Sequence, residues 1–186
     1  MDPALARRFM VDSQLRPQAV TDGAVLAAMA SVPREDFVPA EARSVAYVDR
    51  SIPLGQGRAM MPPAALGRLL SELAPRPGER ALVVGDASGY ASALLAAIGL
   101  TVTSTDRAEA GEPVDIILID GAVAEVPPVL IERLVDGGRL ATAIIERGVS
   151  RLEVGRLVAG SLGLRTLVDA DVAPLPGFER PSVFTF

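Results

Sequence analysis

Apolar residues recur at helical spacing along the first 75 residues of the chain. Residues 22–31 show this spacing behind Thr21, whose hydroxyl can cap a helix, and the segment ends before Pro33. A second helix is predicted to begin at Pro62 and Pro63, because the first helical turn tolerates proline. Its buried stripe consists of Leu66, Leu69, Leu70 and Leu73. We therefore expect a mainly helical N-terminal part.

Short apolar runs replace this spacing after a turn cluster at residues 75–78. Residues 81–84 predict a buried strand, 85–89 form a glycine-containing turn, and 91–98 return to helical spacing. Two further strands are expected at 101–105 and 114–119. Strands that alternate with helices favour a parallel central sheet, because a parallel connection needs a crossover.

The remaining third of the chain predicts one helix and several strands. We expect the helix at 127–135, ended by Asp136, Gly137 and Gly138, and a strand at 139–145. Strands are expected in the tail 151–186, with turns at 160–163 and 174–177. The fold class is thus α/β, a doubly wound and mainly parallel sheet with antiparallel C-terminal edge strands. We expect one domain over 1–186, with a helical segment at 1–75 and the sheet-forming core at 76–186.

The amino-acid composition excludes several kinds of chemistry. The 186 residues are 49% hydrophobic and 22% charged, which is ordinary for a globular protein, but His, Cys, Trp, Lys and Asn are absent. Thiol nucleophiles, disulfides, Cys/His zinc sites, Ser-His-Asp triads and Schiff-base lysines are therefore excluded. Carboxylates, hydroxyls, arginines and the backbone remain to carry a function.

The net charge and the hydropathy of the chain argue against nucleic acid and membranes as partners. The formal charge is −5 and the 18 basic residues are scattered, so we expect no binding to nucleic acid, which needs clustered basic side chains. The longest nearly apolar stretch, 91–100, is too short to cross a bilayer, and the N-terminus has no secretory pattern. We expect a cytoplasmic protein that binds no metal and no membrane.

The glycine turn and an acidic residue beyond it form a candidate ligand site. Ligands of such folds bind outside the carboxyl ends of the strands, where glycines let backbone amides approach them. Asp106 lies about 20 residues past the turn, where a carboxylate can accept hydrogen bonds from ribose hydroxyls. The alternative is structural: Gly85 and Gly89 allow a tight turn and Asp106 caps a loop. Ala87 weakens the ligand interpretation, because its methyl group can obstruct backbone approach.

Longer motifs resemble a known family over nearly the whole chain. In chain order they read MVDSQLRP, VLAAMASVPREDFVP, AYVDRSIPLGQG, PRPGERALVVGDASGYASALLA and EVPPVLIERLVDGGRL. They are similar to the protein-L-isoaspartate O-methyltransferase family, which has a Rossmann-like fold, binds S-adenosylmethionine and methylates isoaspartyl carboxylates in damaged proteins. The resemblance implies that S-adenosylmethionine is the cofactor and that a protein or peptide is the substrate.

The resemblance also implies a role for each matching residue. It places Gly85, Asp86, Ser88 and Gly89 beside the methionine part of the cofactor, Asp106 on the ribose and Asp120 next to the transfer site. Gln56 and Gly57 would form the lip that binds the peptide. The family has a serine where this chain has Met61, and a thioether cannot donate the hydroxyl's hydrogen bond. Met61 is therefore either a substituted substrate-binding residue or apolar cover for a helix start, and no residue is assigned a catalytic role.

The region after Asp106 is shorter than in the family, which has two helices and a strand there. Only 107–113 connect the predicted strands 101–105 and 114–119, and a helical crossover does not fit in so few residues. The sheet should therefore lack one strand, and Arg107 and Glu109 should be exposed. The cofactor's adenine side should be open to water or covered by the connection itself. The strand 101–105 becomes a sheet edge that a second subunit could cover, so a homodimer is expected.

Three functional hypotheses follow from these observations. The first is a methyltransferase of this family acting on isoaspartyl carboxylates. The second is a catalytically inactive binding or regulatory module that has lost the cofactor, as Met61, Ala87 and the short connection favour. The third is a nucleotide-dependent oxidoreductase, which requires only the glycine turn and Asp106, and the motifs of the N-terminal half argue against it.

Overall fold

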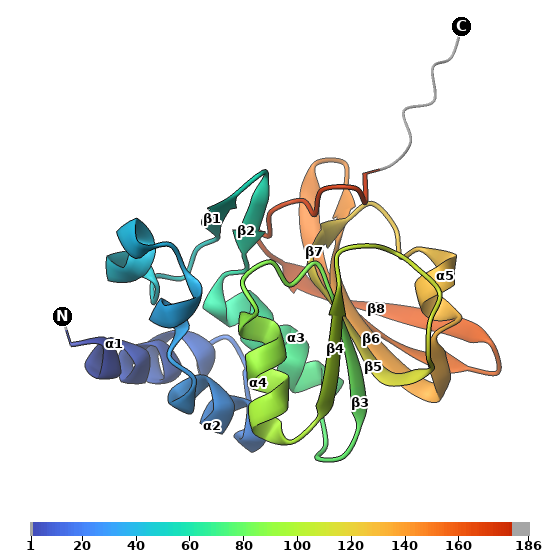
Figure 1. Cartoon of the computed structure of the whole chain (residues 1–186), viewed down its shortest axis with the longest axis horizontal. Coiled ribbons are helices and arrows are strands. Elements are labelled where there is room, and N and C mark those ends of the chain that lie inside the picture. Colours follow the sequence, from blue (N-terminus) through green and yellow to red (C-terminus); the bar gives the residue numbers. More distant parts are fainter. Residues whose placement is uncertain (1, 180–186) are drawn as a thin grey trace, which may run out of the picture.

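A computed structural model describes residues 2–179 of the chain, and its centre is a six-stranded sheet (Figure 1). The strands are β3 (Arg80–Val84), β4 (Thr101–Thr105), β5 (Val114–Val123), β6 (Leu134–Glu146), β7 (Val149–Val158) and β8 (Ser161–Asp169). Their order in the sheet is β4-β3-β5-β6-β7-β8. The pairs among β4, β3, β5 and β6 are parallel, whereas β6–β7 and β7–β8 are antiparallel. The predicted α/β fold with antiparallel C-terminal strands is thus confirmed.

The N-terminal part is helical, as predicted, with one hairpin. Its elements are α1 (Pro3–Met10), the π-helix η1 (Val11–Leu15), α2 (Gly23–Ser31), the 3₁₀ turns η2 (Arg34–Phe37) and η3 (Ala40–Val45), β1 (Ile52–Gly55), β2 (Arg58–Met60) and α3 (Pro63–Leu73). The cap predicted for α2 is wrong by one residue. Asp22, not Thr21, caps the helix, because its Oδ1 accepts from the amides of Ala24 at 2.9 Å and Val25 at 3.0 Å.

One face of the sheet packs against the helices, and we call it the helical face. Side chains alternate along β3 and β5, so Val83, Ile116 and Leu118 point to this side. The cover comes from α2, α3 and α4 (Tyr90–Ile98), together with the N-terminal segment. The leucines of α3 that were predicted to be buried are all at most 1% exposed. The predicted second helix therefore packs its leucine stripe into the core on the helical face.

The opposite face, which we call the loop-covered face, carries Leu82, Val84, Ile117 and Ile119. Its cover is a four-residue helix, α5 (Pro128–Ile131), the connection 106–113 and the segment 170–179. The helix predicted at 127–135 is thus much shorter than expected. Leu134 already pairs with Val114 in the sheet, so the apolar residues after Ile131 join β6 instead of a helix.

The connection between β4 and β5 contains neither a helix nor a strand, as its length predicted. Arg107 and Glu109 are exposed, also as expected. The chain turns sharply here, because the Thr105 hydroxyl donates to Glu109 Oε1 at 2.8 Å and accepts from the amide of Arg107 at 3.2 Å. No described strand pairs with β4 on its other side, so β4 is an edge of the sheet.

The C-terminal tail differs from the prediction. A tight turn at Ala159 and Gly160 joins β7 and β8, but no strand follows β8 up to residue 179. The segment 170–179 instead lies along the end of β5, with one parallel bridge between Ala122 and Pro174. Residues 180–186, part of the predicted tail, lie outside the described residues. None of the described helices has the length and hydropathy to cross a membrane.

Candidate functional site

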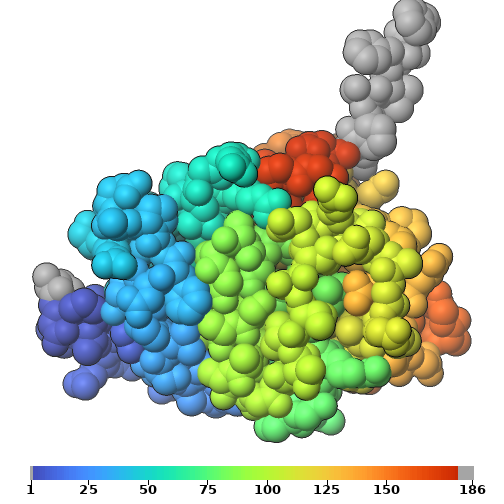
Figure 2. All heavy atoms as spheres, viewed as in Figure 1, coloured from blue at the N-terminus to red at the C-terminus, as the bar shows by residue number. Residues whose placement is uncertain are grey.

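A pocket of about 760 Å³ opens at the carboxyl ends of β3 and β4, beneath the β1–β2 hairpin. It is lined by Leu54, Gly55, Gln56, Arg58, Asp86, Ala87, Ser104, Thr105 and Asp106. Figure 2 shows the hairpin, the connection and the segment 170–179 near one another along the upper rim of the molecule. The strand order reverses at β3, because β4 lies on one side of it and β5 on the other, and α/β folds bind ligands at such a point.

The glycine turn forms the wall below the pocket. Gly85 and Gly89 have φ angles of +82° and +78°, which only glycine adopts freely, so both are needed to bend the chain from β3 into α4. Asp86 Oδ2 accepts from the amide of Ser92 at 2.9 Å, and Ser88 Oγ accepts from the amide of Tyr90 at 3.1 Å. The first turn of α4 is therefore already capped by a carboxylate and a hydroxyl from within the chain.

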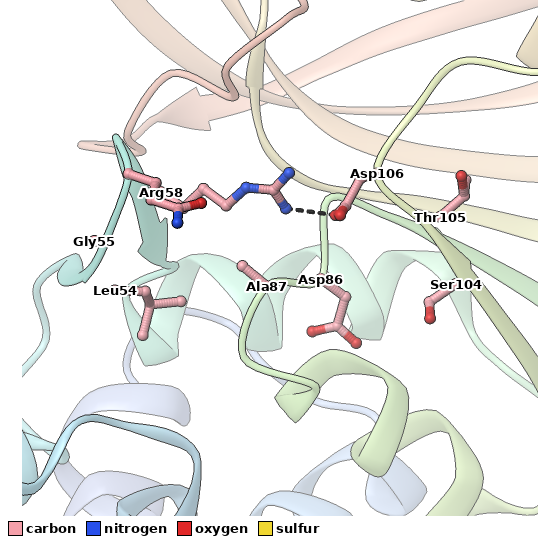
Figure 3. A pocket seen from close by; sticks show the side chains of 9 residues that line it. Leu54, Gly55, Arg58, Asp86, Ala87, Ser104, Thr105 and Asp106 are labelled. Carbon is pink, nitrogen blue, oxygen red and sulfur yellow. Dashed lines mark hydrogen bonds and ion pairs between the residues drawn. The ribbon is translucent and has the colours of Figure 1, made fainter.

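An ion pair crosses the pocket. Arg58, the first residue of β2, extends its guanidinium to Asp106 at the end of β4, and Nη1 donates to Oδ1 (Figure 3). The Arg58 side chain is 24% exposed and that of Asp106 is 61% exposed. Asp86 and Ala87 lie below this ion pair in the same view, with Ala87 between Leu54 of the hairpin and Asp86 (Figure 3). The pocket thus has two carboxylates and one cation in its wall.

The segment 170–179 packs against the base of this region. A Cβ atom on Gly85 would lie 2.6 Å from Leu175 Cδ1, and one on Gly121 would lie 2.8 Å from Leu175 Cβ. The Leu175 amide donates to the Ala122 carbonyl at 2.8 Å, which fixes the segment to β5. Leu175 therefore fills the space above the ends of β3 and β5, and glycine is required on both sides of it.

A cluster of buried polar groups lies behind the glycine turn. Asp120, at the end of the apolar part of β5, is 4% exposed, and its Oδ1 has no hydrogen-bond partner among the described residues. Burial, strengthened by the charge of Asp86 and opposed by Arg34, raises the pKa of Asp120 to about 8. Burial also lowers the pKa of Arg34, whose guanidinium lies 5.1 Å from the centre of the Tyr90 ring. At neutral pH Asp120 is therefore mainly a neutral carboxylic acid.

The structure brings only some of the predicted site residues to the pocket. Gln56, Asp86 and Asp106 line it, and Gly57 lies beside them at the hairpin tip, where its Cβ would be 3.5 Å from Pro176. The predicted residues that lie behind the lining or at the start of α4 are Gly85, Ser88, Gly89 and Asp120. Met61 is 2% exposed and belongs to the hydrophobic core, so the structure does not bring it to the pocket.

Sequence reasoning missed three residues of this region. Arg58 could have been noticed as a lone basic residue directly after the predicted lip. Leu175 lies in a turn-rich run that carries no signal for packing on a glycine turn. Arg34 is fully buried, and its Nε donates to the Ala46 carbonyl at 2.8 Å while Nη2 donates to the Met61 carbonyl. Only its place inside the family-like motif VLAAMASVPREDFVP marked it.

The connection 107–113 does not line the pocket, whose lining on this side ends at Asp106. Whether the adenine side of a cofactor is open to water, as one of the two expected outcomes has it, stays a prediction. Across residues 2–179, no group of three or more Asp and Glu side chains is arranged to hold a metal ion.

Comparison with known proteins identifies the family. A family model described as protein-L-isoaspartate(D-aspartate) O-methyltransferase matches residues 7–110, and the match ends inside the shortened connection. The protein-L-isoaspartate O-methyltransferase of Koribacter versatilis is 32% identical over 204 residues, covering 94% of this chain and 92% of the relative. The protein-L-isoaspartate O-methyltransferase 2 of Marinobacter nauticus is 33% identical over 205 residues, covering 93% of this chain and 94% of the relative. Both alignments are longer than the 186-residue chain, so they contain gaps in it.

A solved structure shares the fold. A Plasmodium falciparum protein assigned as a protein-L-isoaspartate O-methyltransferase, in complex with S-adenosyl-L-homocysteine, superposes with a TM-score of 0.76. The sequences are 16% identical, and the match covers 94% of this chain and 98% of that one. The family model spans more than half of the chain and the relatives align along nearly all of it, and we conclude that this chain belongs to the protein-L-isoaspartate O-methyltransferase family.

Proposed function

We propose that the protein transfers a methyl group from S-adenosylmethionine to the side-chain carboxylate of isoaspartyl residues in proteins or peptides. Family membership supports the reaction, and the position of the pocket supports the cofactor. The single observation that carries the proposal is the pair of carboxylates, Asp86 and Asp106, at the ends of adjacent parallel strands in one open pocket.

The residues present fit a cationic, ribose-containing cofactor. A volume of about 760 Å³ lies within the roughly 300–1,000 Å³ of small-molecule sites. Asp106 is 61% exposed and can accept hydrogen bonds from ribose hydroxyls. Asp86 Oδ1 is a buried acceptor without a described partner, and an ammonium or sulfonium group nearby would compensate it.

The same geometry disfavours a dinucleotide. Oxidoreductases with this fold bind a pyrophosphate at the N-terminus of the first helix, where free amides and the helix dipole attract anions. Here Asp86 already accepts from Ser92 in the first turn of α4, so a pyrophosphate would meet a carboxylate. The charge of Asp86 repels that anion and attracts a cation. The sulfonium cofactor therefore fits this helix start better than a dinucleotide does.

When bound, S-adenosylmethionine supplies an electrophilic methyl group, which leaves sulfur as a carboxylate oxygen forms the new ester bond. This chain's residues need only bind and orient the two reactants, because the carboxylate is already an anion and requires no general base. In the proposal, Asp86 and Asp106 hold the cofactor, with Gly85, Ser88, Gly89 and Asp120 supporting the wall behind them. Gln56 and Gly57 form the lip over which the peptide lies. The absence of histidine is compatible with this role.

A cofactor-free binding module is the second candidate. Two observations favour it: Ala87 lines the pocket with its methyl group, and Met61 has a thioether that cannot donate a hydrogen bond and is buried in the core. The two candidates differ in whether the pocket binds the adenosyl cofactor.

The proposal is tested by methyl transfer to an isoaspartyl hexapeptide, with the ordinary aspartyl peptide as the substrate control. We expect transfer to the isoaspartyl peptide alone. Asp106→Asn should raise the KM for S-adenosylmethionine at least tenfold. Asp12→Asn should not, although Asp12 is also 61% exposed and paired with an arginine, because it lies on η1 away from the pocket. No transfer to either peptide, or equal effects of the two variants, would contradict the proposal.

A further inference from the structure

Arg58 is the only basic residue among those that line the described pocket. It begins β2, immediately after the hairpin tip formed by Gln56 and Gly57, so it lies between the lip and the sheet. Figure 3 shows its side chain spanning the pocket from the hairpin to Asp106. Any molecule that reaches the pocket over the hairpin therefore passes this guanidinium.

The guanidinium has unused hydrogen-bonding capacity. An arginine carries five N–H donors, and within residues 2–179 the Arg58 side chain makes one hydrogen bond, from Nη1 to Asp106. Arg34 provides a contrast, because its Nε and Nη2 both donate to carbonyls in the core. Arg58 is held in place by one carboxylate while Nε and Nη2 can still donate to a second one.

The charges of the pocket lining leave Arg58 as the favourable place for the carboxylate of a bound substrate. Asp86 and Asp106 are the other charged residues of the lining, and both repel an anionic group. An anionic substrate group therefore needs a cation beside it, and Arg58 is the one available. Arginine suits this role because its planar donors match the geometry of a carboxylate.

We propose that Arg58 binds the substrate carboxylate that accepts the methyl group, while the Asp106 ion pair holds its guanidinium in position. This inference rests on the proposed methyltransferase function and names the group that recognises its substrate. It also explains how the reaction can proceed without a donor at Met61. The specificity it predicts is for peptides that present a free carboxylate at the hairpin.

The test compares three variants of the full chain. Arg58→Gln removes the charge, and Arg58→Lys keeps the charge but loses the fork of donors. Arg68→Gln is the matched control, since Arg68 on α3 is 23% exposed and paired with Glu72 but lies outside the pocket. Calorimetry measures S-adenosylhomocysteine binding and then binding of the isoaspartyl peptide to the saturated protein, and the transfer assay gives KM and kcat.

We expect Arg58→Gln to weaken peptide binding and raise the peptide KM by 10-fold to 100-fold, with S-adenosylhomocysteine affinity changed less than threefold. Arg58→Lys should recover part of the loss, and Arg68→Gln should match the wild type. An unchanged peptide affinity in Arg58→Gln, or a loss confined to S-adenosylhomocysteine, would overturn the inference. If the wild type binds S-adenosylhomocysteine but no isoaspartyl peptide, this assignment of substrate is wrong. If it binds neither, the proposed function itself fails and the inference falls with it.

Discussion

The two faces of the central strand β5 are buried to the same degree by very different covers. On the helical face, Ile116 and Leu118 of β5 are 0% exposed beneath three helices and the N-terminal segment. On the loop-covered face, Ile117 and Ile119 of the same strand are also 0% exposed, although one short helix and two irregular segments cover them. A central parallel strand therefore needs apolar cover on both sides, and that cover need not be helical.

The candidate site lies where the two covers meet. Asp86 belongs to the start of α4, on the helical side, and Leu175 comes from the loop-covered side and packs on Gly85. The pocket lining ends at Asp106, where the connection 107–113 of the loop-covered side begins. The connection 107–113 contains neither a helix nor a strand, so the cover next to the pocket is irregular on this side.

The largest expected effect concerns Asp120, which the helical face buries beside Arg34. Its pKa is raised from 3.8 to about 8, so the unfolded chain loses this proton at a lower pH than the folded one. The free energy of unfolding should therefore fall as the pH rises from 4 to 8, by on the order of 5 kcal/mol at most, and then level off. Asp120→Asn should remove this slope in urea unfolding at pH 4, 6 and 8. Parallel profiles for the two proteins would show that Asp120 ionises normally.

The next effect probes the helical cover. Leu70 of α3 is 0% exposed, and Leu70→Ala should lower the free energy of unfolding by about 4 kcal/mol, because rigid helices close a cavity poorly. Leu5→Ala on α1 is the control: this leucine is 44% exposed, so its loss should change stability by less than about 0.5 kcal/mol. Chemical unfolding measures both variants, and equal losses would contradict the assignment of the core.

A smaller effect is expected from the loop cover. Leu175→Ala should cost about 2 kcal/mol, less than Leu70→Ala, because an irregular segment can collapse into the space left by the side chain. Leu175 also packs on Gly85, so the variant should weaken S-adenosylhomocysteine binding in calorimetry. A loss larger than that of Leu70→Ala would mean that the loop cover is the more rigid of the two.

The smallest effect is expected in the connection itself. Seven glycine and serine residues inserted after Ala110 would double the length of 107–113 and leave the Thr105–Glu109 hydrogen bond in place. Loop-closure entropy predicts a cost of about 0.6 kcal/mol for this doubling. A loss above about 2 kcal/mol in thermal or urea unfolding would show that the short connection is itself a structural support.

Local patterns predicted much of the fold and less of the site. The stripe of α3, the strands 81–84 and 101–105 and the lack of a helix in 107–113 follow from periodicity and chain length, and the structure confirms them. The helix expected at 127–135 ends at Ile131, because Leu134 pairs with Val114 and tertiary pairing outweighs local propensity there. Asp86 and Asp106 could be placed at strand ends, whereas the ion pair of Arg58 depends on where a hairpin folds over the sheet.

Calorimetric titration with S-adenosylhomocysteine tests the central claim most directly, because it examines the pocket without requiring a choice of substrate. The account predicts binding with a Kd near 1 μM, which corresponds to about 8 kcal/mol, and weaker binding by Asp106→Asn. No heat and no thermal stabilisation at millimolar ligand would contradict the claim and favour the cofactor-free module instead.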